Sequence, residues 1–127
     1  MQLDQQTQSG DVNRREAQFT RLIKHLDCCR QQQQTATYLD VADAVGIKAP
    51  QRIHQLTELL EALMEHDQRH SQPQRAALVV SRSGTRLPAD GFFLKAKALG
   101  LMQSTTAERF HQQCLKRLFD SSATTST

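Results

Sequence analysis

The sequence predicts a mainly α-helical single domain that carries a small β-hairpin. Three observations support this class. Apolar residues recur at spacings of three and four over most of the chain, as in amphipathic helices. One run, Leu78 to Val80, is instead continuous and rich in β-branched residues, and it lies between Pro73 and the pair Ser83-Gly84. The length of 127 residues suits one domain.

Both ends of the chain are polar and differ in composition from the middle. The first ten residues are rich in Gln, and residues 120–127 read "DSSATTST". Such segments bury too little apolar surface to offset the entropy lost on ordering. We therefore expect a disordered N-terminus over residues 1–10, one domain over residues 11–119 and a disordered tail over residues 120–127.

An amphipathic helix is predicted over residues 12–32, before the run "QQQQT" ends it. Its apolar stripe consists of Phe19, Leu22, Ile23, Leu26 and Cys29. Because this helix precedes the two helices described next, it is an N-terminal addition to them.

A second helix is expected to begin after Thr37, whose hydroxyl suits an N-cap. We expect Leu39, Ala42 and Val45 to face the core. Gly46 then ends the helix, because glycine tolerates the left-handed conformation of many helix ends, and Ile47 can pack back onto the last turn.

A third helix is predicted to begin near Pro50, which suits a first helical turn, and to end between His66 and His70. Its predicted core residues are Ile53, Leu56, Leu60, Leu63 and Met64.

The second half of the chain predicts a hairpin and two further helices. Leu78 to Val80 is read as one strand, Ser83-Gly84 as the turn, and the residues after it as a short return strand. The run "FFLKAKALG" reads as a short helix, with Phe92 and Phe93 as core residues and Gly100 as its end. Thr105 with Glu108 resembles a capping box for a last helix. That helix would bury Phe110, Cys114, Leu115 and Leu118.

Three helices followed by a hairpin form the order of a winged helix, in which the third helix enters the major groove and the hairpin lies along the DNA backbone. Side chains early in the third helix, with one in the turn before it, could donate to phosphates or to base edges. These are Lys48, Gln51, Arg52, His54 and Gln55, and Arg82 and Arg86 lie on the predicted hairpin.

The charges are unevenly distributed. The formal net charge is only +3, but residues 71–100 hold five Lys and Arg and a single Asp, a local charge of +4. Residues 58–67 hold four acidic residues and no Lys or Arg. A basic side favours DNA, whereas the acidic end of the third helix favours a protein partner.

The segment "TYLDVADAVGIKAPQRI" resembles the "TYGDIA…AG.P…AR.VG" segment of alkylguanine-DNA alkyltransferases and alkyltransferase-like proteins. "LVVSRSG" is similar to the strand and turn that follow the "PCHR" motif of this family, and the likeness covers about residues 37–91. In the family the matching Tyr and Arg rotate a damaged nucleotide out of the duplex and fill its place. The resemblance thus implies a winged-helix scaffold, DNA binding, and roles for Tyr38 and Arg52.

The reactive part of that family motif is replaced. Aligning Val79 and Val80 with the two valines of the family places Ala76, Ala77 and Leu78 at its Cys, His and Arg. The three cysteines, Cys28, Cys29 and Cys114, lie outside the segment. We therefore expect no alkyl transfer and carry over nothing catalytic.

Two functions of different kinds remain open. The first is a non-enzymatic regulatory or accessory protein that binds duplex DNA through its third helix and basic hairpin. The alternative is an adaptor or inhibitor that docks its acidic helix face, or its N-terminal amphipathic helix, on a partner protein. If Lys48, Arg52, Arg82 and Arg86 share one face, DNA is favoured; if the acidic stripe of the third helix covers that face, a protein partner is favoured.

Other classes of function find little support in the sequence. His66 and His70 share a helical face, but a zinc site needs three or four ligands at matched spacing. No nucleophile motif or phosphate loop is present, so we expect neither an enzyme nor a cofactor. The N-terminus lacks an apolar signal core and no run approaches a membrane span, so we expect a cytoplasmic protein.

Overall fold

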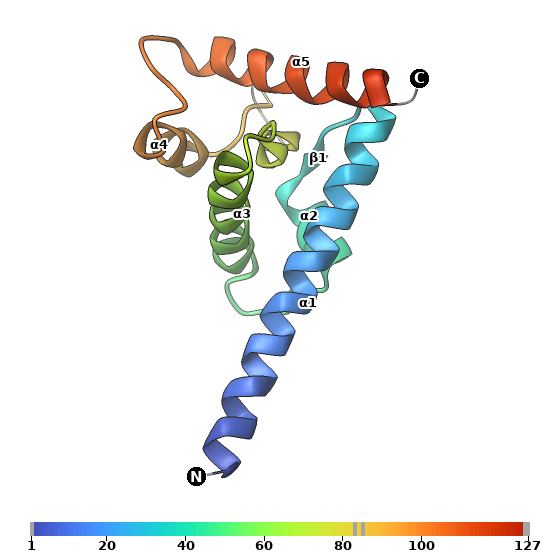
Figure 1. Cartoon of the computed structure of the whole chain (residues 1–127), viewed down its shortest axis with the longest axis vertical. Coiled ribbons are helices and arrows are strands. Elements are labelled where there is room, and N and C mark those ends of the chain that lie inside the picture. The colour runs from blue at the N-terminus through green and yellow to red at the C-terminus, as the bar shows by residue number, and fades with distance from the viewer. Residues whose placement is uncertain (1, 83, 85, 126–127) are drawn as a thin grey trace.

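The computed structural model describes residues 2–82, 84 and 86–125, and the side chains of residues 13–82, 84 and 86–120. The described part is mainly helical with a small β element, which confirms the predicted class (Figure 1). In chain order its elements are α1 (Gln2–Gln32), β1 (Ala36–Thr37), α2 (Tyr38–Val45), α3 (Arg52–Arg69), the 3₁₀ helix η1 (Arg75–Leu78), β2 (Val79–Val80), α4 (Asp90–Ala98) and α5 (Ala107–Thr125).

The β element corrects the predicted hairpin. β2 pairs in parallel with β1, with Ala36 opposite Val79 and Thr37 opposite Val80, rather than with a return strand. Leu78 belongs to η1 instead of the strand. The reason is burial. η1 and β2 lie inside the molecule, and the extended backbone before α2 is the neighbour that pairs with β2.

The β2–α4 loop, residues 81–89, takes the place of the predicted wing. The Ser81 N–H donates to the Leu87 carbonyl at 2.8 Å, and this hydrogen bond joins the two sides of the loop. Arg82 and Arg86 lie between these two residues and are exposed. Ser83, half of the predicted turn, lies outside the described residues.

α2 begins and ends as predicted. The Asp40 N–H donates to the Thr37 hydroxyl at 3.3 Å, and Gly46 is left-handed with φ of 84°. The Ile47 N–H donates to the Ala42 carbonyl at 3.0 Å while its side chain is buried. This pair of features is the glycine-ended helix stop expected from the sequence.

The first and last helices extend into the polar ends of the chain. α1 begins at Gln2 rather than near residue 12, and α5 ends at Thr125. Extending an established helix adds one hydrogen bond for each residue fixed, so a polar segment can continue a packed helix. Figure 1 shows the N-terminal part of α1 projecting away from the other elements.

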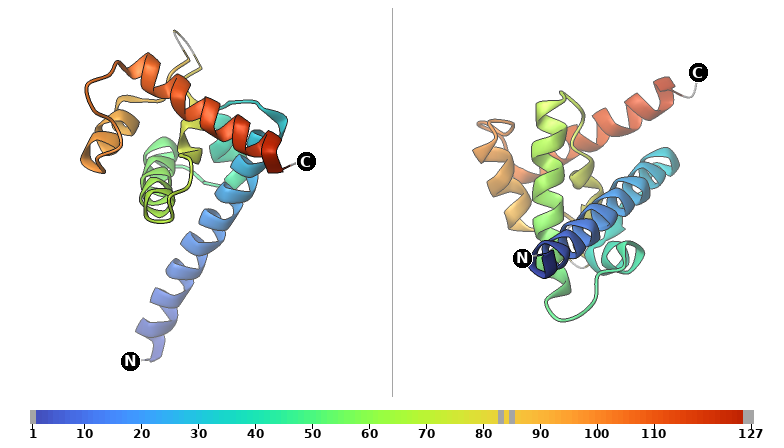
Figure 2. Two further views of the ribbon diagram at one scale, coloured as in Figure 1. Left: turned by 45° about the horizontal axis from the view of Figure 1, so that its top comes forward. Right: turned by 60° about the horizontal axis from the view of Figure 1, so that its bottom comes forward.

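The core surrounds η1, against which α1, α3 and α5 all pack. Figure 2 shows α5 crossing over one end of the molecule, opposite to the projecting N-terminal part of α1. Phe92 and Phe93 are buried against Phe110, as predicted. The largest fully buried apolar side chains are Leu22, Leu26, Leu56, Leu63, Met64, Leu78 and Leu118.

Two residues predicted to be core are exposed. Leu39 retains 48% of its accessible surface and Ile53 retains 41%. α2 instead buries Val41 together with the predicted Ala42 and Val45. An eight-residue helix spans about two turns, so its apolar spacing was compatible with either stripe.

The start of α5 is also corrected by one residue. The Arg109 N–H donates to the hydroxyl of Thr106, at 3.2 Å, rather than to that of Thr105. The Thr105 hydroxyl oxygen is buried and has no hydrogen-bond partner among the described residues.

Candidate nucleic-acid interface

Two hollows meet at the first turns of α3. One is bordered by Gln51, Arg52, Ile53 and His54 of α3 and its N-cap. The other, of about 630 Å³, lies between α2, α3 and the β2–α4 loop, and its lining includes Tyr38, Ile53 and Arg82. Because Ile53 lines both, Arg82 and the N-terminal end of α3 belong to one continuous surface.

Arg52 is already engaged within the protein. Its Nε donates to the Ile47 carbonyl at 3.0 Å, and its terminal nitrogen forms an ion pair with Asp43. These contacts fold the side chain back over the turn between α2 and α3. A role in contacting DNA would therefore require Arg52 to exchange Asp43 for a phosphate or a base edge.

Gln55 also serves the turn that precedes α3. Its side-chain amide donates to the Lys48 carbonyl at 3.1 Å and to the Pro50 carbonyl at 2.8 Å. The turn is thus held by the first part of the helix itself. The ammonium group of Lys48 remains exposed, and it has no acidic partner in the described part of the chain.

Gln51 and His54 present their side chains to solvent at the start of α3. Gln51 is the N-cap residue, with φ of 58°, and it makes no side-chain capping bond. The His54 Nε2 lies 3.4 Å from a Glu58 carboxylate oxygen, an ion pair when the imidazole is protonated. Both residues are placed where the sequence predicted exposed polar groups.

Tyr38 is half-buried and holds the end of the β2–α4 loop. Its hydroxyl accepts a hydrogen bond from the Ala89 N–H at 2.7 Å. Burial raises the pKa of Tyr38, an effect that this hydrogen bond partly opposes. The phenol is therefore neutral at physiological pH.

The two arginines of the β2–α4 loop are not equivalent. Arg82 lines the hollow beside Tyr38, together with one acidic residue, Asp40. Arg86 has φ of 57° and does not line that hollow. The structure thus brings Arg82 to the surface around α3 and leaves Arg86 at its margin.

Two acidic residues in the C-terminal half of α3 form ion pairs with other elements. Glu65 pairs with Lys95 at 2.9 Å, and the hydrogen bond and charge of Lys95 lower the pKa of Glu65. Asp67 is fully buried and pairs with Arg75 at 2.8 Å. These partners come from α4 and η1, so this part of the acidic stripe serves packing between helices.

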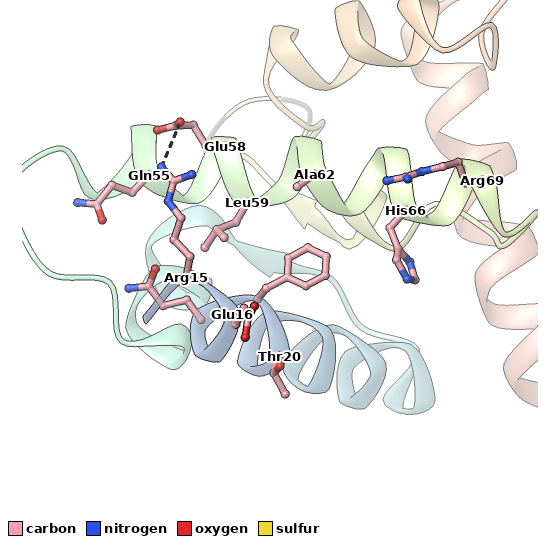
Figure 3. A pocket seen from close by; sticks show the side chains of 11 residues that line it. Arg15, Glu16, Thr20, Gln55, Glu58, Leu59, Ala62, His66 and Arg69 are labelled. Atoms are coloured by element: carbon pink, nitrogen blue, oxygen red, sulfur yellow. Dashed lines mark ion pairs between the residues drawn. The ribbon is translucent and has the colours of Figure 1, made fainter. Parts of the chain in front are cut away.

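A groove of about 600 Å³ runs between α1 and α3 (Figure 3). Its apolar lining comes from Phe19, Leu59 and Ala62. At its rim Arg15 pairs with Glu58 at 3.7 Å, as the dashed line in Figure 3 marks. This groove places apolar side chains beside the acidic residues of α3.

The remaining reactive groups are dispersed. Within the described ranges, no cluster of three or more His, Cys, Asp and Glu side chains could hold a metal ion. The rings of His66 and His70 stack at 4.3 Å between centroids. Cys29 is buried, and burial raises the pKa of Cys114 to about 11.

The sequence had missed Asp43 as the partner of Arg52 and the exposure of Leu39 and Ile53. Asp43 and Arg52 lie on different helices, and only the geometry of the turn brings them together. The sequence offered no periodic signal for such a contact. For Leu39 and Ile53, the helical spacing of apolar residues predicted burial. Spacing alone does not show which apolar side chains another element will cover.

Comparisons with known proteins add no family to this picture. The scan against protein-family models found no match, and neither the curated proteins nor the solved structures gave one. Among the helices described, none is both long and apolar enough to cross a bilayer.

Proposed function

We propose that this chain is a non-enzymatic, cytoplasmic DNA-binding protein, a regulator or accessory factor that contacts duplex DNA through the N-terminal half of α3 and the β2–α4 loop. The observation that carries the proposal is the division of charge along α3. Its far carboxylates, Glu65 and Asp67, form ion pairs within the protein, and the exposed Glu58 pairs with Arg15. Lys48 and Arg82 stand exposed near the N-terminal end of the helix.

The side chains of this surface suit DNA, which offers phosphate oxygens and the hydrogen-bonding edges of its bases. Lys48 and Arg82 can donate to phosphate oxygens without regard to sequence. The amide of Gln51 and the imidazole of His54 can donate to or accept from base edges. Arg52 can join them if it leaves Asp43, and its fork of donors suits either a phosphate or a guanine.

The resemblance to the alkyltransferase family supports a DNA ligand but no reaction. In the structure the positions aligned with the reactive Cys and His are Ala76 and Ala77, and both are buried in η1. We expect the protein to remain unmodified when incubated with alkylated guanine. Intact-mass spectrometry would detect the contrary result, a stoichiometric adduct.

The test of DNA binding is a titration of labelled duplex at several salt concentrations. We expect wild-type binding whose logarithm falls linearly with the logarithm of salt. The Arg82→Ala, Arg86→Ala double variant should bind all sequences more weakly and with a slope reduced by about one to two. Lys116→Ala, an exposed change on α5, is the control for lost charge.

A wild-type protein that fails to bind duplex DNA even at low salt would contradict the proposal. In that case the second candidate, a protein-binding adaptor, becomes the better one. The exposure of Leu39 and Ile53 on adjoining helices favours it, because apolar side chains of this size gain free energy when a partner covers them. Unchanged DNA binding by the Leu39→Ser, Ile53→Ser variant would separate the two functions.

A further inference from the structure

A second basic hollow lies on the other side of α3, between α1 and the turn that joins α2 to α3. It encloses about 620 Å³. Its polar lining consists of Arg14, Gln18 and Arg21 of α1, Lys48 of the turn and Gln55 of α3. Figure 1 shows α1 passing beside this turn and continuing beyond it.

The lining of this hollow carries positive charge alone. It includes three cations and no Asp or Glu among the described residues. The nearby Glu16 lines the separate groove between α1 and α3. Arg14 and Arg21 are seven residues apart on α1, about 10 Å along a helix, roughly three times the axial rise between phosphates of one strand, so the two side chains can reach different phosphates.

One of the cations is fixed in place by the fold. A terminal nitrogen of Arg21 donates to the Val45 carbonyl at 3.3 Å, at the end of α2. A side chain at Gly46 would approach the same nitrogen at 3.2 Å, so the glycine leaves room for it. Arg21 keeps other N–H donors for a ligand, since a guanidinium carries five.

The position of the hollow relative to Arg82 follows from the geometry of α3. Ile53 and Thr57 line the hollow that contains Arg82, whereas Gln55 lines the hollow on the α1 side. At about 100° per residue, Gln55 points roughly 200° away from Ile53. Ala49 lines both this hollow and the one at the tip of α3, so the surface is continuous.

From this geometry we infer that α1 forms a second contact with the DNA backbone: Arg14, Arg21 and Lys48 bind phosphates on the side of α3 opposite to Arg82. The inference rests on the proposed function and extends it from a contact on one side of α3 to a clamp on both. A helix that enters a groove lies between two sugar-phosphate strands, so a basic surface on each of its sides fits a duplex.

The experiment compares Arg14→Ala with Arg15→Ala in duplex DNA of 25 base pairs, titrated at several salt concentrations. The two changes remove the same charge from neighbouring residues, but Arg15 faces the groove with Glu58. We expect Arg14→Ala to reduce the salt slope by about one and Arg14→Ala, Lys48→Ala by about two, with Arg15→Ala near the wild type. Each lost contact should weaken binding on the order of tenfold at low salt.

Three results would overturn the inference, and they are distinguishable. If Arg14→Ala binds as wild type while Arg82→Ala, Arg86→Ala is weaker, the α1 contact is excluded and the proposed function stands. If Arg14→Ala and Arg15→Ala weaken binding equally, the effect is one of general charge and the hollow is no site. If wild type does not bind duplex at low salt, the proposed function fails, and this inference fails with it.

Discussion

Arg52, which the sequence predicts to contact DNA, is bound to other groups of the protein in the structure. The sequence placed it on an exposed helical turn, and the structure binds it to Asp43 and to the Ile47 carbonyl. Asp43 is well exposed, so this ion pair contributes little to stability, below about 1 kcal/mol. Its larger consequence is electrostatic, because Asp43 offsets the positive charge that Arg52 could offer to DNA.

We therefore predict that substitutions of Asp43 and of Arg52 change the affinity for duplex DNA in opposite directions. Asp43→Asn should strengthen duplex binding several-fold, because it removes a negative charge and releases Arg52, whereas Arg52→Ala should weaken it. Dissociation constants measured at fixed salt would check both. Glu108→Gln, an exposed acid on α5, is the matched control. Weaker binding by Asp43→Asn would mean that Arg52 acts only when held by Asp43.

His111 is a buried polar residue of α5. Its Nε2 donates to the Ala77 carbonyl in η1 at 2.9 Å. Burial lowers the pKa of His111, although the hydrogen bond opposes the shift. The folded state therefore holds the neutral imidazole, while the unfolded chain binds a proton from about pH 6.5 downward.

The free energy of unfolding should consequently fall as the pH drops below about 6.5, because the unfolded state then binds more protons than the folded state. The contribution is fully present above that pH. Urea unfolding at pH 7.5 and pH 5.5 would measure the loss, and His111→Gln should show a smaller difference between the two. An equal difference in wild type and variant would assign the pH dependence to other groups.

At the scale of the element, the start of α5 tests how closely a helix cap can be located from sequence. Thr105 and Thr106 are chemically identical and adjacent, but only Thr106 caps the helix. Thr106→Ala should lower the free energy of unfolding by about 1 kcal/mol, the usual cost of a lost N-cap.

Thr105→Val is the matched change one residue earlier. The Thr105 hydroxyl oxygen is buried without a described partner, so replacing it by a methyl group of similar shape should be neutral or stabilising. Chemical denaturation of both variants gives the comparison. A larger loss for Thr105→Val than for Thr106→Ala would restore the capping box that the sequence suggested.

At the scale of the whole molecule, a buried ion-pair network joins elements that are distant in the chain. Arg75 of η1 pairs with Asp67 of α3 at 2.8 Å and with Asp27 of α1 at 3.2 Å. Burial acts to lower the pKa of Arg75, but the two carboxylates raise it above its usual value. The network thus fixes η1 between α1 and α3.

Removing one buried partner should be costly. Asp67→Ala leaves Arg75 without its buried counter-ion, and we expect a loss of about 3–5 kcal/mol in the free energy of unfolding. Asp27→Ala, at the more exposed end of the network, should cost about 1 kcal/mol or less. Thermal and urea unfolding would rank the two, and equal costs would show that Asp67 is not the principal counter-ion.

The sequence alone determined the helices and the ends of several of them. Apolar spacing located α1, α2, α3, α4 and α5, and local chemistry placed the stop at Gly46, because a left-handed residue and its hydrogen bonds depend on a few consecutive positions. It also identified Lys48, Gln51, His54 and Arg82 as exposed polar residues near the start of α3 or on the loop beside it, since polarity at such positions is a local property.

Only the tertiary structure decided which elements are neighbours. The pairing of β2 with β1, the exposure of Leu39 and Ile53, and the capture of Arg52 by Asp43 depend on groups that are separated along the chain. The sequence pattern indicates that a side chain can be buried or form a hydrogen bond. The packing of the other elements determines whether a neighbouring group is present to cover it or bind it. The basic hollow between α1 and the α2–α3 turn arises in the same way, because its cations are scattered along the chain and meet only in the fold.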